Sequence, residues 1–368
     1  MSVETPTPTL NIPACLQQAC RQQPFSAAQA EALMRAFTCD SLPPAVVGAL
    51  LGALATRLPT VAELTGFARA LRQQMQPLTL PDGPRFARTI DTCGTGGDGG
   101  QSFNVSTAVA LLVAAAGLPV LKHGNRSVSS RSGSADVLAA LGLNTDRHQQ
   151  AESVKADFKQ HGIGFCFAPD EKPALQAVAP VRQALGAQGL RTVFNLLGPL
   201  CNPARVPVQL LGVFDPALTD VLAEVLHKLG TRRALVVSAE GGQGLDEISL
   251  AGPTRCSRLD QGQIRSLQIR PQDLGLRPAP LAAVRGGDAA FNARLIEGIF
   301  AGQVQGPPRD LVCLNAAAAL WTAEASTSLA DGLQLARATL DSGKALGLLQ
   351  ALRHSQAPAC LPGERHHV

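Results

Sequence analysis

Residues 91–107 read DTCGTGGDGGQSFNVST, and this stretch decides the fold because it joins a glycine-rich turn to the start of a helix. Five of the seven residues from 94 to 100 are glycines, so the backbone can adopt conformations closed to other residues and approach a ligand closely. Ser106 and Thr107 stand where the helix begins, and amide N–H groups at a helix N-terminus point at anions. The stretch therefore predicts a cradle for phosphate or pyrophosphate. The alternative is a glycine-rich surface turn, which the succession of polar residues makes the weaker interpretation.

Outward from this stretch, short β-like runs alternate with helices, which indicates an α/β domain. Strands are expected at residues 118–121, 209–213 and 234–237, and helices at residues 135–141, 146–161, 172–185, 289–300, 311–325 and 328–352.

The N-terminal part, residues 10–76, reads as helices only. Ser26 is an expected N-cap, and Thr60 is another, with Glu63 at the spacing of a capping box. Pro43-Pro44 opens the helix between them. We expect a helical domain over residues 1–85 and an α/β domain over residues 86–368, with a hinge rich in proline and glycine around residues 78–90.

The composition of the 368 residues excludes several classes of protein. Hydrophobic residues make up 45% and charged residues 16%, which suits a large core and not a disordered chain. The formal charge is only +4, so a dedicated nucleic-acid binder is not indicated. The longest apolar run, residues 108–121, is interrupted by Gly117 and Pro119, and no membrane association is expected. The nine cysteines form no CxxC pair, so reduced thiols and a cytoplasmic location are expected, without a signal peptide.

A second polar cluster, residues 122–134, follows the strand expected at 118–121. It holds two arginines, one lysine and five serines, a dense array of donors suited to phosphate oxygens. A loop at the end of such a strand lies at the carboxyl edge of the sheet, where α/β proteins bind ligands. A solvated polar loop is the alternative, and His123 by itself is more often structural than catalytic.

Two further features are weaker when taken singly. Asp246 and Glu247 follow a glycine-rich turn, and Mg²⁺ is often held by one or two carboxylates together with substrate phosphates. An isolated acidic pair is usually a solvated corner, so the two phosphate-type loops upstream carry the metal interpretation. Arg182 lies among apolar residues of an expected helix, where it either extends its charge to water or binds a carboxylate with two hydrogen bonds. The residues alone leave these two roles for Arg182 open.

These four clusters, in this order, resemble the anthranilate phosphoribosyltransferases. The matching stretches, which fall within residues 10–352, are Gly94-Thr95-Gly96-Gly97-Asp98, Phe103-Asn104-Val105-Ser106-Thr107, residues 122–130, Val193-Phe194-Asn195-Leu196-Leu197-Gly198-Pro199, Asp246-Glu247-Ile248-Ser249, Gly306-Pro307-Pro308-Arg309-Asp310 and Leu314-Asn315-Ala316-Ala317. The resemblance implies a small helical N-terminal domain plus a larger α/β domain with a central sheet, like that of nucleoside phosphorylases and phosphoribosyltransferases. It also implies that part of residues 165–200 joins the helical domain in space, and that the enzyme is a homodimer.

The resemblance implies a reaction as well. Members transfer the phosphoribosyl group of phosphoribosyl pyrophosphate (PRPP) to the amine of anthranilate, in tryptophan biosynthesis, with Mg²⁺, here expected as two ions. The PRPP residues it implies are Gly94, Gly97, Asp98, Ser102, Asn104, Val105, Ser106, Thr107, Lys122, His123, Gly124, Asn125, Arg126, Ser127, Val128, Ser129, Ser130 and Ser134. Those for anthranilate are Gly94, Asn125 and Arg182, and those for the metal are Ser106, Asp246 and Glu247. No general base is assigned, because the aniline nitrogen is already a neutral nucleophile.

The chain departs from the family pattern near the expected acceptor site. Lys172 replaces a common histidine, Ala187-Gln188-Gly189 looks like an insertion, and the turn before Asp246 is lengthened and lacks the usual His-Gly. A phosphoribosyltransferase for another aromatic amine is therefore an alternative. A pyrimidine nucleoside phosphorylase would leave Asp246 and Glu247 unexplained. A catalytically silent nucleic-acid-binding relative should have a broad basic groove, which a charge of +4 does not favour.

Overall fold

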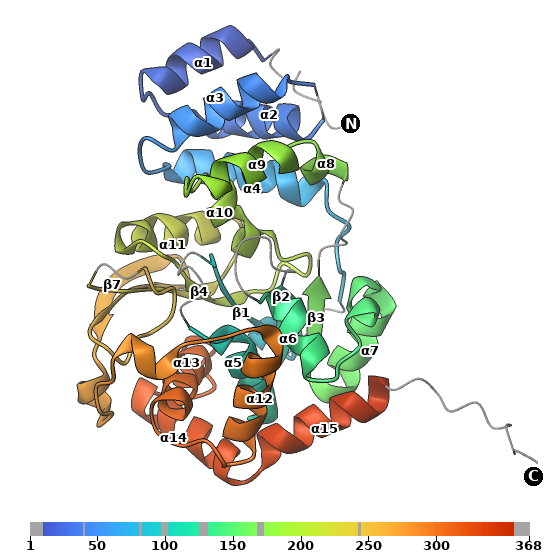
Figure 1. The fold of residues 1–368 in the computed structure, drawn as a ribbon, viewed down its shortest axis with the longest axis vertical. Coiled ribbons are helices and arrows are strands. Elements are labelled where there is room, and N and C mark those ends of the chain that lie inside the picture. The colour runs from blue at the N-terminus through green and yellow to red at the C-terminus, as the bar shows by residue number, and fades with distance from the viewer. Residues whose placement is uncertain are drawn as a thin grey trace, which may run out of the picture.

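The computed structural model describes residues 10–39, 41–80, 83–96, 102–124, 132–167, 173–241 and 244–356. A seven-stranded sheet lies at the centre of the larger part of the molecule (Figure 1). Its strands, in chain order, are β1 (Ile90–Gly94), β2 (Val120–Gly124), β3 (Ile163–Phe167), β4 (Val208–Gly212), β5 (Arg233–Ala239), β6 (Thr254–Asp260) and β7 (Gln263–Ile269). The spatial order is β3-β2-β1-β4-β5-β6-β7, with the first five strands parallel and the last two antiparallel.

The position of β1 in this order locates the ligand-binding edge. The chain runs from β1 outward to β2 and β3, and then crosses to the other side of β1 to form β4 and β5. Gly94 at the end of β1 is in register with Gly212 at the end of β4. In open α/β sheets, ligands bind outside the carboxyl ends of the strands where the order reverses. The crevice between β1 and β4 is such a point.

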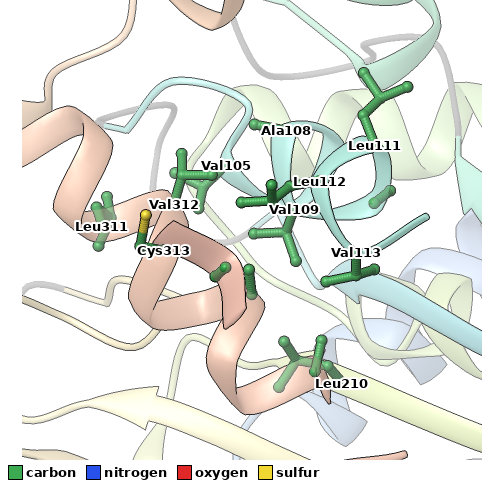
Figure 2. Close-up of a cluster of buried hydrophobic side chains, with 14 of the residues drawn as sticks. Val105, Ala108, Val109, Leu111, Leu112, Val113, Leu210, Leu311, Val312 and Cys313 are labelled. Carbon is green, nitrogen blue, oxygen red and sulfur yellow. The ribbon is translucent and has the colours of Figure 1, made fainter. Parts of the chain in front are cut away.

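Helices cover both faces of the sheet. The face toward the C-terminal part carries α5 (Val105–Ala115), α6 (Ser134–Ala140), α12 (Ala289–Phe300), α13 (Pro307–Thr322), α14 (Leu329–Asp341) and α15 (Lys344–Gln356). Figure 2 shows α5 packed against α13 through Val109, Leu112 and Val312, with Leu210 of β4 close by. Both helices are apolar nearly all round because they are buried between the sheet and the outer helices. One further helix, α7 (Ala151–His161), packs on β3 at the end of the sheet.

The helical domain lies on the opposite face of the sheet (Figure 1). Its helices are α1 (Ile12–Cys20), α2 (Ala27–Thr38), α3 (Pro44–Leu54) and α4 (Val61–Gln73). From later in the chain, α8 (Pro173–Gln176) packs on α2 and α9 (Ala179–Ala187) packs on α3, while α10 (Phe194–Leu197) and α11 (Thr219–Lys228) lie between these helices and the sheet. One buried cluster joins Phe67 of α4 to Leu222 of α11 and Val236 of β5. The helical domain therefore shares a core with the sheet.

Several sequence predictions are confirmed and others are wrong. Ser26 and Thr60 cap α2 and α4 with complete capping boxes, and Pro44 begins α3. The predicted helix over 328–352 is wrong as one unit, because Gly343 takes a left-handed φ of 73° that ends one helix and begins the next. The prediction for 146–161 splits into a 3-10 turn and α7. In the predicted helix 172–185, Lys172 lies outside the described residues, and the rest forms α8 and α9. The strands β1, β3, β6 and β7 were not predicted.

The structure bears on two expectations from the composition, the state of the cysteines and the absence of a membrane-spanning helix. All eight cysteines within the described residues are free thiols. Among the helices described, none is both long and apolar enough to span a bilayer.

Candidate active site

Asp246 packs directly against the ends of β1 and β4. A Cβ atom on Gly94 would lie 2.4 Å from Asp246 Oδ2, and one on Gly212 would lie 1.5 Å from the Asp246 carbonyl oxygen. Only glycine fits at either strand end, since carbon and oxygen atoms do not approach so closely. The Gly96 N–H donates to Asp246 Oδ2 over 2.8 Å, so this carboxylate also holds the first part of the glycine-rich loop. The site therefore lies at the crevice that the sheet topology indicates.

Asn315, on α13, fixes the segment that carries Asp246 and Glu247. Its Oδ1 accepts from the Ile248 N–H at 2.9 Å, and its Nδ2 donates to the Ile248 carbonyl oxygen at 3.0 Å. The side chain is fully buried, and Nδ2 also donates to the Leu311 carbonyl oxygen within α13 at 3.0 Å. The backbone just after the acidic pair is thus bound on both sides. The sequence prediction gave Asn315 no role in the site, because a lone asparagine in an alanine-rich helix carries no local signal.

Lys122 is a buried cation at the end of β2. Its side chain is 2% exposed. The ammonium donates to the Thr92 carbonyl oxygen and, at 3.2 Å, to Ser106 Oγ. Burial lowers the pKa of Lys122, while the charges of Asp91, Cys93 and Glu247 act in the opposite direction. The ammonium therefore links β1 to the start of α5 and lies within reach of the Glu247 charge.

Asp91 and Asn202 hold the end of β2 through buried hydrogen bonds. The Asp91 carboxylate accepts from the His123 N–H at 3.1 Å and from Asn202 Nδ2 at 2.9 Å. Asn202 also donates to the Leu121 carbonyl oxygen at 2.9 Å. Burial raises the pKa of Asp91 to about 6, although Lys122 opposes this rise. These contacts hold residues 122–124 in place, where the polar loop begins.

The predicted residues at the start of α5 play different parts. Asn104 is the N-cap position of α5 but makes no side-chain cap bond, because its amide is bonded elsewhere. Val105 is buried in the core, and its N–H donates to the Phe103 carbonyl oxygen. The Thr107 hydroxyl is buried with no hydrogen-bond partner in the described part of the chain. Ser106 is half-buried beside Lys122.

Three more predicted residues lie around this centre. A Cβ atom on Gly124 would lie 2.4 Å from Ser134 Oγ, so the end of β2 and the start of α6 approach closely. Ser102 forms an isolated antiparallel bridge with Arg285. The backbone of Ser102 also lies close to Gly286, whose added Cβ atom would meet the Ser102 carbonyl oxygen at 2.6 Å. The segment 285–287 therefore supports the chain just before α5.

Arg182 lies apart from these residues, on α9. Its guanidinium lies over the ring of Phe194, 4.8 Å from the centroid. Burial lowers the pKa of Arg182, and none of the described carboxylates forms an ion pair with it. Residues 187–189, the suspected insertion, are exposed at the end of α9, where Gly189 takes a φ of 76°. No contact among the described residues joins Arg182 to Gly94, Lys122 or Asp246.

Some predicted residues cannot be placed. Those that lie outside the described residues are Gly97, Asp98, Asn125, Arg126, Ser127, Val128, Ser129 and Ser130. The described chain meets this group at both ends, through Gly96 and Gly124 before it and Ser102 and Ser132 after it.

The donor atoms near Lys122 fit a hard cation. The Ser106 hydroxyl and the carboxylates of Asp246 and Glu247 offer oxygen ligands only, which Mg²⁺ prefers. Within the residues that the structure describes, no cluster of three or more histidine, cysteine or acidic side chains gathers to hold a metal. Two carboxylates suit an ion that takes its other ligands from substrate phosphates and water.

Two family models match the chain. Residues 13–75 match the helical bundle domain of a glycosyl transferase family, and residues 87–346 match its a/b domain. An anthranilate phosphoribosyltransferase of Symbiobacterium thermophilum is 44% identical over 92% of this chain and 96% of its own length. Another, of Moorella thermoacetica, is 46% identical over 90% of this chain and 94% of its own.

Solved structures agree with these matches. The crystal structure of anthranilate phosphoribosyltransferase from Thermus thermophilus aligns with a TM-score of 0.82 at 39% identity, over 94% of this chain and 99% of that chain. The Saccharomyces cerevisiae enzyme in complex with PRPP and Mg aligns with a TM-score of 0.80 over 94% of this chain and 98% of that chain. At 24% identity, the second alignment supports the fold alone.

Proposed function

This chain belongs to the anthranilate phosphoribosyltransferase family, and we propose that it carries out that family's reaction at the carboxyl edge of its sheet. The reaction moves the phosphoribosyl group of PRPP to the amine of anthranilate, which yields N-(5-phosphoribosyl)anthranilate and pyrophosphate for tryptophan biosynthesis. The observation that carries the proposal is the packing of Asp246 against Gly94 and Gly96, with the buried Lys122 ammonium beside Ser106. This arrangement combines oxygen ligands for a cation with donors for phosphate.

PRPP would lie across the ends of β1, β2 and α5. Lys122 and the amides of the first turn of α5 offer positive charge and donors to phosphate oxygens. Ser106, Asp246 and Glu247 would hold Mg²⁺, and we propose two ions. When bound, Mg²⁺ stabilises the negative charge that develops on the leaving pyrophosphate. Gly94 and Gly212 leave room for Asp246 to pack against the ends of β1 and β4, and this close packing fixes the position of Asp246.

The chemistry asks the chain for positioning and electrostatics. Loss of pyrophosphate builds positive charge on the ribosyl group and negative charge on the leaving group. The buried Lys122 ammonium acts more strongly here than it would in water, because its surroundings have a low dielectric constant. The amine of anthranilate attacks as a neutral nucleophile, so we assign no side chain as general base. Catalysis then comes from holding the two substrates in contact.

Arg182 is proposed to bind the carboxylate of anthranilate. A half-buried guanidinium without an ion pair among the described residues suits an incoming carboxylate, which it can bind with two parallel hydrogen bonds. The ring of Phe194 covers one face of the guanidinium, which leaves its edge for that carboxylate. Gly94, whose lack of a side chain lets Asp246 pack against the end of β1, and Asn125 are proposed as further anthranilate contacts.

We also propose that the enzyme is a homodimer and acts in the cytoplasm. The family resemblance supports the dimer. The free thiols of the described cysteines suit a reducing compartment.

The direct test is fluorescence-monitored consumption of anthranilate with PRPP and Mg²⁺. The double variant Asp246→Ala/Glu247→Ala should lose about 10³-fold or more of the turnover, because metal charge stabilisation contributes several kcal/mol. The double variant Glu152→Ala/Glu224→Ala, which removes two exposed carboxylates elsewhere, is the matched control and should keep full turnover. Tight PRPP binding without consumption of anthranilate would overturn the acceptor and direct the search to other aromatic amines.

A further inference from the structure

Asn292, on α12, is buried and hydrogen-bonded to three segments that are distant in sequence. Its Nδ2 donates to Asn104 Oδ1 and to Ser132 Oγ, each at 2.9 Å. Its Oδ1 accepts from the Gly287 N–H at 2.8 Å. Nδ2 also donates, over a longer 3.3 Å, to the Gly287 carbonyl oxygen, so both amide hydrogens and the oxygen of this side chain, which is 2% exposed, are bonded within the protein. Asn292 thus joins the start of α5, the end of the polar loop and the segment before α12.

The orientation of the Asn104 amide follows from these bonds. A backbone N–H only donates, so Gly287 fixes which end of the Asn292 amide faces it. The donor end of Asn292 then faces Asn104, which must present its oxygen. Ser132 Oγ also donates to Asn104 Oδ1, at 3.1 Å. Asn104 Oδ1 therefore serves two donors inside the protein. Its Nδ2 makes one long bond, to the Ser132 carbonyl oxygen at 3.4 Å, and has a second hydrogen to offer a ligand.

We propose that Asn292 is a positioning residue for the phosphoribosyl donor substrate. It holds the Asn104 amide so that this side chain offers a hydrogen-bond donor, and not an oxygen, to the anionic oxygens of PRPP. It also binds Ser132 to Asn104, and so keeps the returning end of the polar loop against the start of α5. The inference rests on the proposed function, because PRPP is the donor substrate of that reaction and the family resemblance assigns Asn104 and residues 122–130 to it.

The segment before α12 is itself well anchored, which makes Asn292 a firm support. Gly286 lies so close to the chain before α5 that an added Cβ atom would be 2.6 Å from the Ser102 carbonyl oxygen and 2.8 Å from Phe103 Cα. The Phe103 N–H donates to the Val284 carbonyl oxygen at 3.4 Å. The same two stretches of chain therefore meet twice, through backbone contacts and through Asn292.

The substitution Asn292→Asp separates positioning from simple packing. The new side chain has nearly the same shape and keeps an oxygen for the Gly287 N–H. It replaces the donor that faces Asn104 Oδ1 with a second oxygen, so the Asn104 amide must rotate to donate inward. Asn104 would then present its own oxygen to the phosphate oxygens of PRPP, which repel it. A protonated carboxyl group could still donate, so the defect should shrink as the pH is lowered.

The experiment measures PRPP binding by calorimetry with Mg²⁺, and steady-state kinetics for both substrates, in the full-length protein. For Asn292→Asp we expect the Kd and KM for PRPP to rise about 10- to 100-fold, as one buried hydrogen bond is replaced by facing acceptors. The KM for anthranilate should change by less than about threefold. In the double variant Asn104→Ala/Asn292→Asp, the Kd for PRPP should equal that of Asn104→Ala alone, because Asn292 acts through Asn104.

The control variant is Leu333→Ala, which removes buried apolar contact on α14 in the same domain. It should lower the melting temperature and leave the Kd for PRPP unchanged. If Asn292→Asp behaves in the same way, Asn292 is only structural and the inference is overturned. If Asn292→Asp does not fold, Asn292→Ser gives the same readout with a smaller side chain. Wild-type protein that binds PRPP but does not consume anthranilate would refute the proposed acceptor alone, whereas wild-type protein that does not bind PRPP would refute both proposals.

Discussion

The helical domain and the candidate site differ in how their charged side chains are balanced. In the helical domain, Glu63 is fully buried, and its carboxylate accepts from the guanidinium of Arg57. It also accepts from the Phe25 N–H at 3.0 Å and the Thr60 N–H at 2.8 Å. Burial acts to raise the pKa of Glu63, but the bonds from Arg57 and these amides leave it below the ordinary value. This charge is satisfied within the chain.

Two cations of the candidate site, Lys122 at the end of β2 and Arg182 on α9, form no ion pair with a described residue, although the charges of Asp91 and Glu247 act on Lys122. The described contacts of Lys122 are with neutral oxygens, and Arg182 lies over an aromatic ring. Burial lowers the pKa of both groups. The difference teaches that the Arg57–Glu63 pair stabilises the fold, whereas Lys122 and Arg182 are the cations that we propose to bind anions from outside. Variants on the two sides should therefore change different quantities.

The largest effect is expected for Arg57→Met in the helical domain. It leaves the Glu63 carboxylate buried without its opposite charge, which costs about 3–5 kcal/mol of the free energy of unfolding. Lys228→Met, which removes a cation from the exposed pair with Glu224, should cost no more than about 1 kcal/mol. Denaturant unfolding of both variants measures the contrast. Equal effects from the two would show that burial does not distinguish these pairs.

A buried histidine extends the structural side of the comparison to pH. His148 packs against the rings of Phe165 and Phe167, and its Nε2 accepts from Gln356 Nε2 at 3.2 Å. Burial, with a smaller contribution from Arg147, lowers the pKa of His148 from 6.5 to about 4. The unfolded chain binds a proton at His148 more tightly than the folded chain does. The free energy of unfolding should therefore fall as the pH drops from about 6.5 to about 4.

The expected loss from His148 is about 3 kcal/mol, since each pKa unit corresponds to about 1.4 kcal/mol. His148→Leu should flatten this part of the stability profile and leave the kinetics at neutral pH unchanged. Denaturant unfolding at a series of pH values measures it. An unaltered profile in His148→Leu would assign the acid sensitivity to other groups.

On the other side of the comparison, Lys122→Met should affect binding and not folding. The Kd for PRPP should rise about 100-fold, because a preorganised cation in a low-dielectric site is lost. The free energy of unfolding should fall by less than in Arg57→Met, since removing a buried charge offsets the two lost hydrogen bonds and the Asp91 carboxylate keeps its bonds from the His123 N–H and Asn202. Calorimetry and denaturant unfolding test both parts. A severe loss of stability with unchanged PRPP binding would show that Lys122 stabilises the fold, as Arg57 and Glu63 do, and does not bind PRPP.

Local signals in the sequence predicted part of the fold. The caps at Ser26 and Thr60 were recoverable because a capping box lies within four consecutive residues. The hairpin of β6 and β7 was not, because its strands carry arginine, serine and glutamine on their exposed sides and β7 is half-exposed. Such polar strands lack the apolar runs by which β4 and β5 were recognised.

The residues of the candidate site also differ in whether a local signal in the sequence marks them. The glycines and serines of the phosphate loops carry a dense local signal, and the resemblance adds their roles. Asn292 and Asn315 carry none, since each is one polar residue in an otherwise apolar helix face. Their partners are Asn104 and Ile248, which lie 188 and 67 positions away in the sequence. Only the folded chain brings these pairs together, so no local pattern could have given either asparagine its role, although Asn315 lies in a stretch that matches the family.

A smaller effect is expected for Arg182→Gln. The KM for anthranilate should rise about 10- to 50-fold, because a bidentate bond from a charged donor is lost. The Kd for PRPP should not change, and the preference for anthranilate over aniline, which lacks the carboxylate, should disappear. Arg191→Gln is the matched control, since Arg191 also lies over a ring, that of Phe214, at 4.3 Å. A preference for anthranilate that survives in Arg182→Gln would show that another group recognises the carboxylate.

The smallest effect separates the charge of Arg182 from its orientation. Phe194→Leu keeps an apolar side chain beneath the guanidinium and removes the ring, so the KM for anthranilate should rise about two- to fivefold, the worth of one cation–π contact. Phe37→Leu removes a neighbouring ring, 6.4 Å from that of Phe194, and should lower stability without changing this KM. The double variant Arg182→Gln/Phe194→Leu should match Arg182→Gln, because the ring acts only through the arginine. If Phe194→Leu leaves the KM unchanged, α9 alone orients Arg182, and the guanidinium is as firmly fixed by its helix as the Lys122 ammonium is by its two oxygen acceptors.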